Sequence, residues 1–296
     1  MGHARRRHLA ATLASTRNGA NDPTTVTGPD RIARATLDAH ARPVGVSARL
    51  QADCTIRVTT HHGEHSVLAG HPLFGDGDPG HRVTPSHPAV ARAMARYGDI
   101  HLARTDTPYH ELLPAVLAQR VTAREAITQW SRICRMWGEQ VHVDGVILHA
   151  PPTPERLLAV APHEWHLLGV ERRRAETLRN VARHADRLLA GWKEELPVPE
   201  RTASFTLIPG VGVWTAAVAG HTAFGDPDAL EFGDFHVKNT VAWALEGRAR
   251  GTDEEMQRTM QVYAGDRRRV LTWLVMDGWS APARGPRRRI LDIARL

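Results

Sequence analysis

Two residues that could carry chemistry stand on either side of a loop in the last third of the chain, Trp214 and Asp234. Asp234 directly precedes the segment FHVK, where an aspartate is expected to cap a helix by accepting hydrogen bonds from its first amides. A carboxylate can also stabilise the positive charge that builds on a sugar as a glycosidic bond breaks, and it can orient or deprotonate water. Asp234 is therefore a candidate helix cap and a candidate catalytic carboxylate, and the two roles are compatible.

A short glycine-containing segment, LIPGVG at residues 207–212, stands just before Trp214. Gly210 and Gly212 allow left-handed backbone dihedrals and a close approach of the main chain to a ligand. The apolar run over residues 214–219 predicts a buried helix, and the first amides of a helix point outward without partners. A hairpin that leads into such a helix start is expected to bind a phosphate.

The charge of the chain is positive and is due almost entirely to arginine. Among 296 residues, Lys and Arg number 38 and Asp and Glu number 32, so the formal net charge is +6. Lys193 and Lys238 are the only lysines. Because the planar guanidinium binds phosphate bidentately, this balance favours nucleic acid over acidic small molecules, although a general bias towards arginine would give the same numbers.

The cysteine and hydropathy patterns argue against two classes of protein. Cys54 and Cys134 are far apart and follow no metal-binding spacing, so we expect no iron–sulfur cluster and a reducing cytoplasm. No run of 18 apolar residues occurs, so the sequence predicts no membrane span. Four histidines surround an expected turn, with no fixed face and with no cysteine or acidic triad beside them: His61, His62, His65 and His71. We expect a solvated hairpin tip there rather than a metal site.

Composition and periodicity divide the chain into four parts. Residues 1–44 are expected to form a disordered or loosely attached basic arm, and residues 45–85 a small antiparallel β element. Residues 86–280 show helical periodicity, including a capping box from Thr122 that starts a long amphipathic helix, and residues 281–296 form a basic tail. The expected fold class is mainly α with a small N-terminal β element (α+β).

Taken together, the motifs resemble one family. The pattern LIPGVGVWTA, then GDPDA, then GDFH is similar to the helix–hairpin–helix Gly/Pro/Asp (HhH-GPD) superfamily of DNA glycosylases, and especially to its bacterial 3-methyladenine DNA glycosylase II group. The resemblance covers roughly residues 85–280 and is dense in LPAVLAQRVTAREA, EWHLLGVERRRAETL and YAGDRRRV. A lone Pro-Gly-x-Gly is weak evidence, but the hairpin, the tryptophan and the aspartate at this spacing are specific together. The resemblance implies the HhH-GPD glycosylase fold.

The resemblance also implies that Asp234 is catalytic and that Trp214 lines the base pocket. Bifunctional members carry a lysine at the position of Trp214. That lysine forms a Schiff base with the sugar and leads to strand cleavage. Tryptophan cannot do this, so the chain resembles the monofunctional branch, which hydrolyses the base and leaves an abasic site. An electron-rich ring attracts a cationic alkylated purine, and Phe235 is a candidate second wall. The alternative for Trp214 is an ordinary core residue at a helix start.

The same match assigns contacts to DNA. Gln119 and Arg120 align with the loop that the family pushes into the DNA stack when it flips a base. Arg120 stands where the best-known relative has a leucine, and such wedges are usually apolar, so a stacked guanidinium and an ordinary polar loop both stay open. The amides of Gly210 and Gly212 are expected on a phosphate, with Lys238 and Arg267 as further phosphate contacts.

Relatives hold a monovalent cation on carbonyls of the hairpin. By the same match, these are the carbonyls of Thr206, Ile208 and Val211 in this chain. The resemblance therefore implies a structural Na⁺ or K⁺ at the hairpin and no cofactor required for the reaction.

The leading interpretation is a monofunctional DNA glycosylase of base excision repair that removes alkylated purines, of the 3-methyladenine and 7-methylguanine class, from double-stranded DNA. We expect it to act as a monomer at the nucleoid in the cytoplasm. The alternatives are a non-catalytic helix–hairpin–helix DNA-binding protein and a glycosylase for another damaged base. Asp234 discriminates, because a protein that only binds DNA needs the glycines but has no use for a carboxylate at that position.

Overall fold

The computed structural model, which describes residues 8–282, places an antiparallel sheet at the start of the chain. Helix α2 (Leu9–Ala14) is followed by strands β1 (Thr25–Thr27), β2 (Arg31–Leu37) and β3 (Pro43–Leu50). The expectation of a disordered or loosely attached arm over residues 1–44 is therefore wrong from residue 8 onward. Residues 1–7 of the expected arm lie outside the described part of the chain, and so do residues 283–296 of the expected basic tail.

Contacts between distant segments order this N-terminal region. Leu9 and Leu13 of α2 are buried in one cluster with apolar residues of the sheet. Arg34 of β2 is 2% exposed, and its guanidinium donates to the Thr16 carbonyl at 3.0 Å and to Glu111, with which it forms a buried ion pair. A buried arginine is tolerated only with such partners. Because Glu111 lies 77 residues downstream, the composition of the segment does not reveal the pairing.

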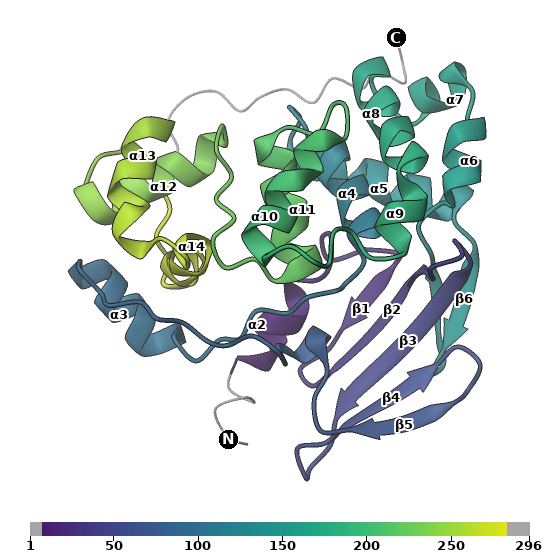
Figure 1. Cartoon of the computed structure of the whole chain (residues 1–296), viewed down its shortest axis with the longest axis horizontal. Helices are drawn as coiled ribbons and strands as arrows, with labels where there is room; N and C mark the ends of the chain where they lie inside the picture. The colour runs from purple at the N-terminus through teal and green to yellow at the C-terminus, as the bar shows by residue number, and fades with distance from the viewer. Residues whose placement is uncertain (1–7, 283–296) are drawn as a thin grey trace.

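Strands β4 (Ile56–Thr60) and β5 (His65–Leu68) complete a five-stranded antiparallel sheet in the order β1-β2-β3-β4-β5 (Figure 1). The register aligns Ile32 with Ala48 and Ala48 with Val58, so these side chains share one face. That face is covered by α2 and by the 3₁₀ turn η1 (Pro72–Phe74). The β element expected over residues 45–85 is the second half of this larger sheet.

The first part of the helical body contains α3 (Pro88–Tyr97), α4 (Pro108–Leu117) and α5 (Ala123–Trp137). Thr122 caps α5, since its hydroxyl accepts a hydrogen bond from the Glu125 amide at 3.2 Å, as the capping motif predicts. A two-stranded hairpin of β6 (Gln140–Val143) and β7 (Val146–His149) then packs on β3.

The following helices complete one large core over the sheet (Figure 1). Apolar side chains of the elements named below are buried in the same core as those of α4 and α5. Leu113 of α4, Trp130 of α5 and Phe205 of a later turn are three of them. In chain order the elements are α6 (Pro154–Ala159), α7 (Pro162–Leu167), α8 (Arg172–Arg183), α9 (Ala185–Leu189), α10 (Val198–Ser204), the 3₁₀ turn η2 (Phe205–Leu207) and α11 (Val213–Phe224).

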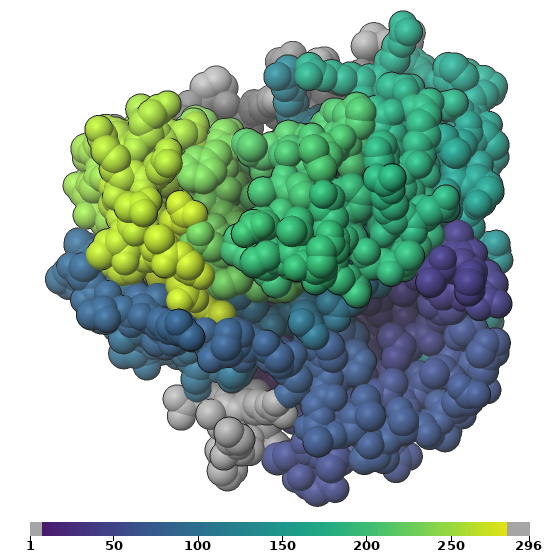
Figure 2. All heavy atoms as spheres, in the orientation of Figure 1, coloured from purple at the N-terminus to yellow at the C-terminus, as the bar shows by residue number. Residues whose placement is uncertain are grey.

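A second helical group forms around its own apolar cluster. It contains α12 (Phe235–Glu246), α13 (Asp253–Met260), the 3₁₀ turn η3 (Gln261–Tyr263) and α14 (Arg267–Met276), together with the earlier helix α3. Val90 of α3, Val241 of α12 and Trp273 of α14 are all buried in it. Figure 2 shows the C-terminal segment, in yellow, packed against the blue segment that includes α3.

The architecture confirms the expected fold class, which is mainly α with an N-terminal antiparallel β element. The segment 207–234 leaves the large core with α11 and enters the second helical group at α12. The candidate residues Trp214, at the start of α11, and Asp234, at the start of α12, therefore belong to elements of two different groups.

Candidate active site

Asp234 occupies the N-cap of α12, as the sequence predicts. Its Oδ1 accepts hydrogen bonds from the amides of His236 at 2.7 Å and Val237 at 3.1 Å. Two such bonds fix the carboxylate and place its negative charge at the positive end of the helix. The side chain is half-buried, so the cap stays in contact with the surface of the molecule.

The second oxygen of Asp234 joins the carboxylate to Trp214. The indole Nε1 of Trp214, in the first turn of α11, donates to Asp234 Oδ2 at 3.0 Å. Each carboxylate oxygen has about two acceptor sites, so Oδ2 keeps one site for water or for a developing positive charge. Because the indole is half-buried and is fixed through its N–H, the ring is held beside the carboxylate. The structure thus brings together the two residues from which the sequence argument started.

A second acidic side chain lies one short turn before Asp234. Glu231 is 6% exposed, and its carboxylate pairs with the guanidinium of Arg268 at 3.1 Å. Burial raises the pKa of Glu231, the Arg268 charge opposes that shift, and the nearby Asp234 charge adds to it. The Asp234 amide donates to the Glu231 carbonyl at 3.1 Å, so the ion pair and the cap belong to one rigid turn. Sequence reasoning did not find Glu231 or Arg268.

Phe235 does not face Trp214. Its ring is 57% exposed, and it lies 5.4 Å from the ring of His236 and 5.3 Å from the guanidinium carbon of Arg250. Among the described residues, no ring contact joins Phe235 to Trp214. The role of Phe235 as a second wall of a base pocket stays a prediction, and it would require the base to bring the two rings together.

The two glycines of the hairpin have different backbone conformations. Gly210 has a φ of +90°, the left-handed region that favours glycine. Gly212 has a φ of −91° and a ψ of 176°, which any residue adopts, so the expectation of left-handed dihedrals holds for Gly210 only. Gly212 is the N-cap of α11, it is exposed, and a Cβ placed on it would meet no atom of residues 8–282 within 4 Å. Within the same residues, the amides of Gly212, Val213 and Trp214 donate no hydrogen bond.

The difference between the two glycines predicts effects of different size from an added methyl group. A Cβ at Gly210 would overlap the side chain of Thr177 on α8 and would force a left-handed alanine. We expect Gly210→Ala to lower the free energy of unfolding by about 2 kcal/mol. Gly212→Ala serves as the matched control and should cost at most about 1 kcal/mol. Urea unfolding of both variants measures the difference, and equal stabilities would contradict the backbone assigned to Gly210.

The hairpin is supported by α8. The Asn180 side-chain amide donates to the Pro209 carbonyl at 3.0 Å, and Thr177 lies against Gly210. Arg174, in the same helix, is 2% exposed and donates to the Leu117 carbonyl at 2.8 Å. The sequence holds a signal for Arg174, because it precedes the buried Leu178 by four residues and Val181 by seven, and so shares their inward face.

Gln119 and Arg120 lie in the tight turn between α4 and α5. Gln119 donates to the Gly210 carbonyl at 3.1 Å and to the Thr215 hydroxyl at 2.9 Å. Arg120 is exposed and has a φ of +59°, a left-handed conformation that is strained for a side chain other than glycine. Such strain at an exposed tip is typical of functional loops. The structure therefore places the predicted wedge loop directly beside the hairpin.

The two further phosphate contacts predicted from the sequence already have protein partners. Lys238 pairs with Asp253 at 2.9 Å, and Asp253 also accepts the Gly233 amide at 2.8 Å. Arg267 forms a two-bond ion pair with Asp228, which raises the pKa of the guanidinium. The first pair joins α12 to α13, and the second ties the loop that contains Asp228 to the start of α14. The phosphate contacts of Lys238 and Arg267 stay predictions, and only their remaining N–H donors could make them.

The three carbonyls predicted to hold a cation differ in the hydrogen bonds that they accept. Within the described residues, the carbonyls of Thr206 and Val211 accept no hydrogen bond, whereas the Ile208 carbonyl accepts the Val211 amide at 3.0 Å. The residue three positions after Thr206 is Pro209, which has no amide to donate. Two unpaired carbonyls and one partly used carbonyl fit a weakly bound monovalent cation.

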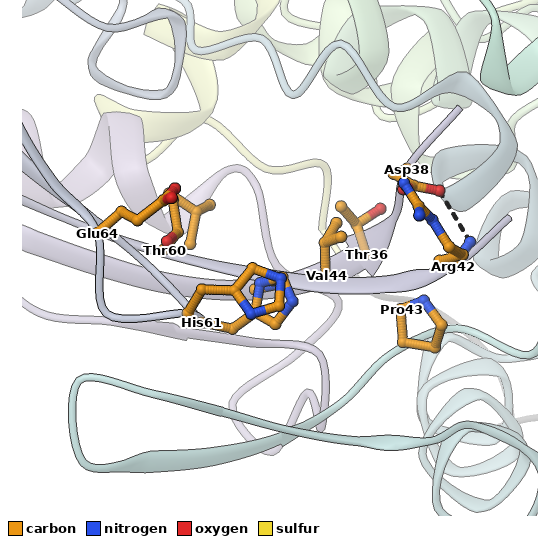
Figure 3. A pocket seen from close by; sticks show the side chains of 11 residues that line it. Thr36, Asp38, Arg42, Pro43, Val44, Thr60, His61 and Glu64 are labelled. Atoms are coloured by element: carbon orange, nitrogen blue, oxygen red, sulfur yellow. Dashed lines mark hydrogen bonds and ion pairs between the residues drawn. The ribbon is translucent and has the colours of Figure 1, made fainter. Parts of the chain in front are cut away.

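Other potential sites lie away from Asp234. A cavity of about 550 Å³ lies on the sheet between the ion pair of Asp38 and Arg42 and the side chain of Glu64 (Figure 3). A second cavity, of about 640 Å³, is lined by α9 and the segment after it, from His184 to Glu195, and by Leu207. In residues 8–282, no group of three or more His, Cys, Asp or Glu side chains could hold a metal ion. The same residues contain no helix of the length and apolar character needed to cross a membrane.

Comparison with known proteins gives the family. Residues 113–264, half of the chain, match the HhH-GPD superfamily of base excision DNA repair proteins. The chain belongs to the HhH-GPD superfamily. The matched segment contains the hairpin, Trp214 and Asp234, so the pair held by the 3.0 Å hydrogen bond lies within the part that defines membership.

The curated relatives that the HhH-GPD chain matches are much longer proteins. It is 34% identical over 131 residues to a probable bifunctional transcriptional activator/DNA repair enzyme AlkA of Mycobacterium tuberculosis. The match covers 42% of this chain and 25% of the relative, so the chain spans about a quarter of that protein.

Solved structures share the fold over a greater length. A 3-methyladenine DNA glycosylase from Archaeoglobus fulgidus superposes with a TM-score of 0.64 at 18% identity, over 93% of this chain and 94% of that one. The Schizosaccharomyces pombe 3-methyladenine DNA glycosylase Mag1, in complex with abasic DNA, gives 0.51 at 20% identity, over 62% of this chain and 88% of that one. The first comparison includes the N-terminal sheet, so the sheet and the helical body together form the shared fold.

Proposed function

We propose that this HhH-GPD protein is a monofunctional DNA glycosylase that flips an alkylated purine out of double-stranded DNA and hydrolyses its N-glycosidic bond. The observation that carries the proposal is the Asp234 carboxylate, fixed by two helix amides and by the Trp214 indole beside the hairpin. Family membership supports the reaction class, and the names of the relatives support 3-methyladenine-type substrates.

Asp234 supplies the electrostatic part of the reaction. As the bond to the base breaks, positive charge builds on the deoxyribose, and a fixed carboxylate beside that charge stabilises the transition state. The site on Oδ2 that the indole leaves open can accept a proton from the attacking water. The abasic site is then the product, because no lysine stands at position 214 to form a Schiff base.

Trp214 supplies selectivity for alkylated bases. Methylation at a ring nitrogen of a purine in DNA gives a cationic base, and the face of an indole attracts a cation. The N–H of Trp214 is directed to Asp234, so the ring cannot rotate away without losing that hydrogen bond. A charged base held between the ring and the carboxylate would also be the better leaving group.

The hairpin and the turn between α4 and α5 supply DNA binding. The amides at the start of α11, beside the exposed Gly212, would bind a backbone phosphate, and Arg120 would enter the space left by the flipped base. A Na⁺ or K⁺ on the carbonyls of Thr206, Ile208 and Val211 would add positive charge near that phosphate. All these groups lie on one chain, so the proposal needs no second subunit, and such an enzyme would act on nucleoid DNA in the cytoplasm.

Two other functions remain to be tested against this one. A non-catalytic DNA-binding protein would keep the hairpin and use Asp234 only as a cap. A glycosylase for another damaged base would keep Asp234 and differ in the pocket. The site geometry favours catalysis over binding alone, because a simple cap has no need of an indole on its second oxygen.

The deciding experiment is incubation with methylated duplex DNA and chromatography of the released bases. We expect free 3-methyladenine or 7-methylguanine and a strand that stays intact until alkali cleaves it at the abasic site. Borohydride should trap no covalent protein–DNA adduct, because tryptophan forms no Schiff base. A trapped adduct would overturn the monofunctional assignment, and binding without release of any base would favour the non-catalytic alternative.

A further inference from the structure

Gln119 is held by the protein in a way that its predicted contact with DNA does not explain. Its side-chain nitrogen donates to the Gly210 carbonyl at 3.1 Å and to the Thr215 hydroxyl at 2.9 Å. A carbonyl can only accept a hydrogen bond, so the nitrogen of the side-chain amide must face Gly210. That nitrogen carries two hydrogens, and both are used.

The remaining atom of the side chain is unsuited to a phosphate. With both N–H donors engaged, Gln119 can offer only its carbonyl oxygen, which repels an anionic oxygen. A direct phosphate contact would require both hydrogen bonds to break. The geometry therefore gives Gln119 a different role from Arg120, although the two are neighbours in the sequence.

The two partners of Gln119 belong to different parts of the site. Gly210 is the left-handed residue of the hairpin, and Thr215 is 2% exposed and directly follows Trp214 in α11. The loop that contains Gln119 is also held from its other side, where Arg174 donates to the Leu117 carbonyl at 2.8 Å. Gln119 thus connects the Arg120 loop to the hairpin and to the helix of the base-pocket tryptophan.

Such a connection has a use in base flipping. Arg120 is held at a φ of +59°, and a left-handed arginine returns to a more common conformation unless its neighbours are fixed. A wedge must occupy the gap at the moment when the base leaves it, so its position relative to the phosphate grip decides how well the flipped state competes with the stacked state. Fixing that distance in advance saves ordering entropy during the reaction.

We infer that Gln119 is a positioning residue for base flipping: it locks the Arg120 wedge loop to the phosphate-binding hairpin and to the helix of Trp214. The inference rests on the proposed function and adds one consequence to it. The hydrogen bonds of Gln119 stabilise the flipped state but contribute nothing to binding of the stacked duplex.

The test uses three single variants of the full chain and the double variant of Gln119→Met with Thr215→Val. Gln119→Met keeps the length of the side chain and removes both hydrogen bonds, and Thr215→Val removes one acceptor with little change of shape. The third, Gln257→Met, is a matched control on an exposed glutamine of α13. Each variant is compared with wild type in thermal midpoint, in affinity for undamaged duplex and in single-turnover release of a methylated purine. 2-Aminopurine placed beside the lesion reports flipping by its fluorescence.

Gln119→Met should reduce both the flipped fraction and the single-turnover rate about tenfold, while its affinity for undamaged duplex stays within about twofold. Thr215→Val should give about a threefold loss, and the double variant should lose little more than Gln119→Met alone, because the two residues share one interaction. Gln257→Met should match wild type. An equal loss of affinity for damaged and undamaged DNA would make Gln119 a phosphate contact and overturn the inference.

A measurement without DNA keeps the inference separate from the proposed function. Amide hydrogen exchange of the free proteins should speed up at residues 210–215 and in the turn around Arg120 in Gln119→Met, and not in Gln257→Met. If wild type releases no base, the proposed function fails. The exchange measurement still tests the Gln119 connection, because it uses the free proteins without DNA. Unchanged exchange at the hairpin together with unchanged flipping would show that Gln119 locks nothing.

Discussion

Asp234→Asn is expected to abolish base release, with a fall in the single-turnover rate of at least about 100-fold, and to leave DNA binding within about twofold of wild type. The carboxylate is needed when charge builds on the sugar, whereas the phosphate grip lies at the hairpin. The loss of negative charge therefore affects the transition state and not the ground-state complex. Base release by chromatography and duplex affinity by fluorescence anisotropy measure the two effects separately.

The asparagine variant is the right probe because it preserves the cap. Asparagine is as good an N-cap as aspartate, and its oxygen can still accept the amides of His236 and Val237. Its NH₂ group would then face the Nε1–H of Trp214, where two donors meet without an acceptor. We expect this local conflict to cost about 1 kcal/mol of stability, which is far too little to unfold the protein.

The matched control is Asp186→Asn, which removes a carboxylate from an exposed position on α9. It should release bases at the wild-type rate. If Asp234→Asn turned over near the wild-type rate, Asp234 would be only a cap, and the non-catalytic alternative or a different catalytic group would have to be considered. Glu231, in the same turn, would then be another candidate carboxylate, although its ion pair with Arg268 holds it within the turn.

The pairing of Asp234 with Trp214 could be predicted from the sequence because its determinants are local. An aspartate ahead of a helix, a glycine-rich turn and a tryptophan at the next helix start are all read over a few residues each, and the family pattern sets their spacing. The fold then adds only the 3.0 Å hydrogen bond between them. Fold class follows in the same way, since helical periodicity and caps are local signals.

The features that the sequence does not predict depend on contacts between distant residues. Strands β1 and β2 are missed, whereas the rest of the sheet is expected. β1 has only three residues, and Arg34 of β2 depends on Glu111, which no local pattern indicates. The ion pairs of Arg267 and Lys238 are also absent from any local pattern, because their partners are Asp228, in a separate loop, and Asp253, at the start of α13. A basic residue near a DNA-binding motif suggests a phosphate contact in the sequence, and only the fold shows which guanidinium is already paired.

The glycines of the hairpin show how structure sharpens a sequence prediction. From the sequence, Gly210 and Gly212 are equivalent small residues beside a helix start. In the structure, Gly210 is required by its positive φ and by its contact with Thr177, whereas no contact with the described residues requires the absence of a side chain at Gly212. Because the fold does not require a glycine at position 212, close contact with a ligand is the remaining reason for the absence of a side chain there.

Gly212→Val should therefore fold normally and bind DNA about tenfold more weakly, damaged and undamaged alike. Its φ of −91° and ψ of 176° suit valine, and no atom from residues 8 to 282 lies within 4 Å of a Cβ at this position. The added side chain would hold the DNA backbone away from the first amides of α11. Because phosphate contacts carry little sequence information, the loss should be the same for both kinds of duplex. Titrations over a range of salt concentrations measure it, since each lost phosphate contact lowers the slope of log affinity against log salt by about one.

Two further variants complete this test. Gly212→Ala should give a smaller loss in the same direction, and Ala39→Val, an exposed residue in the turn between β2 and β3, should bind as wild type does. A loss confined to damaged DNA would place Gly212 in the base pocket rather than at a phosphate. Unchanged affinity in a folded Gly212→Val protein would remove the start of α11 from the DNA interface, and the Gln119 connection would then link the wedge loop to a turn with no grip on DNA.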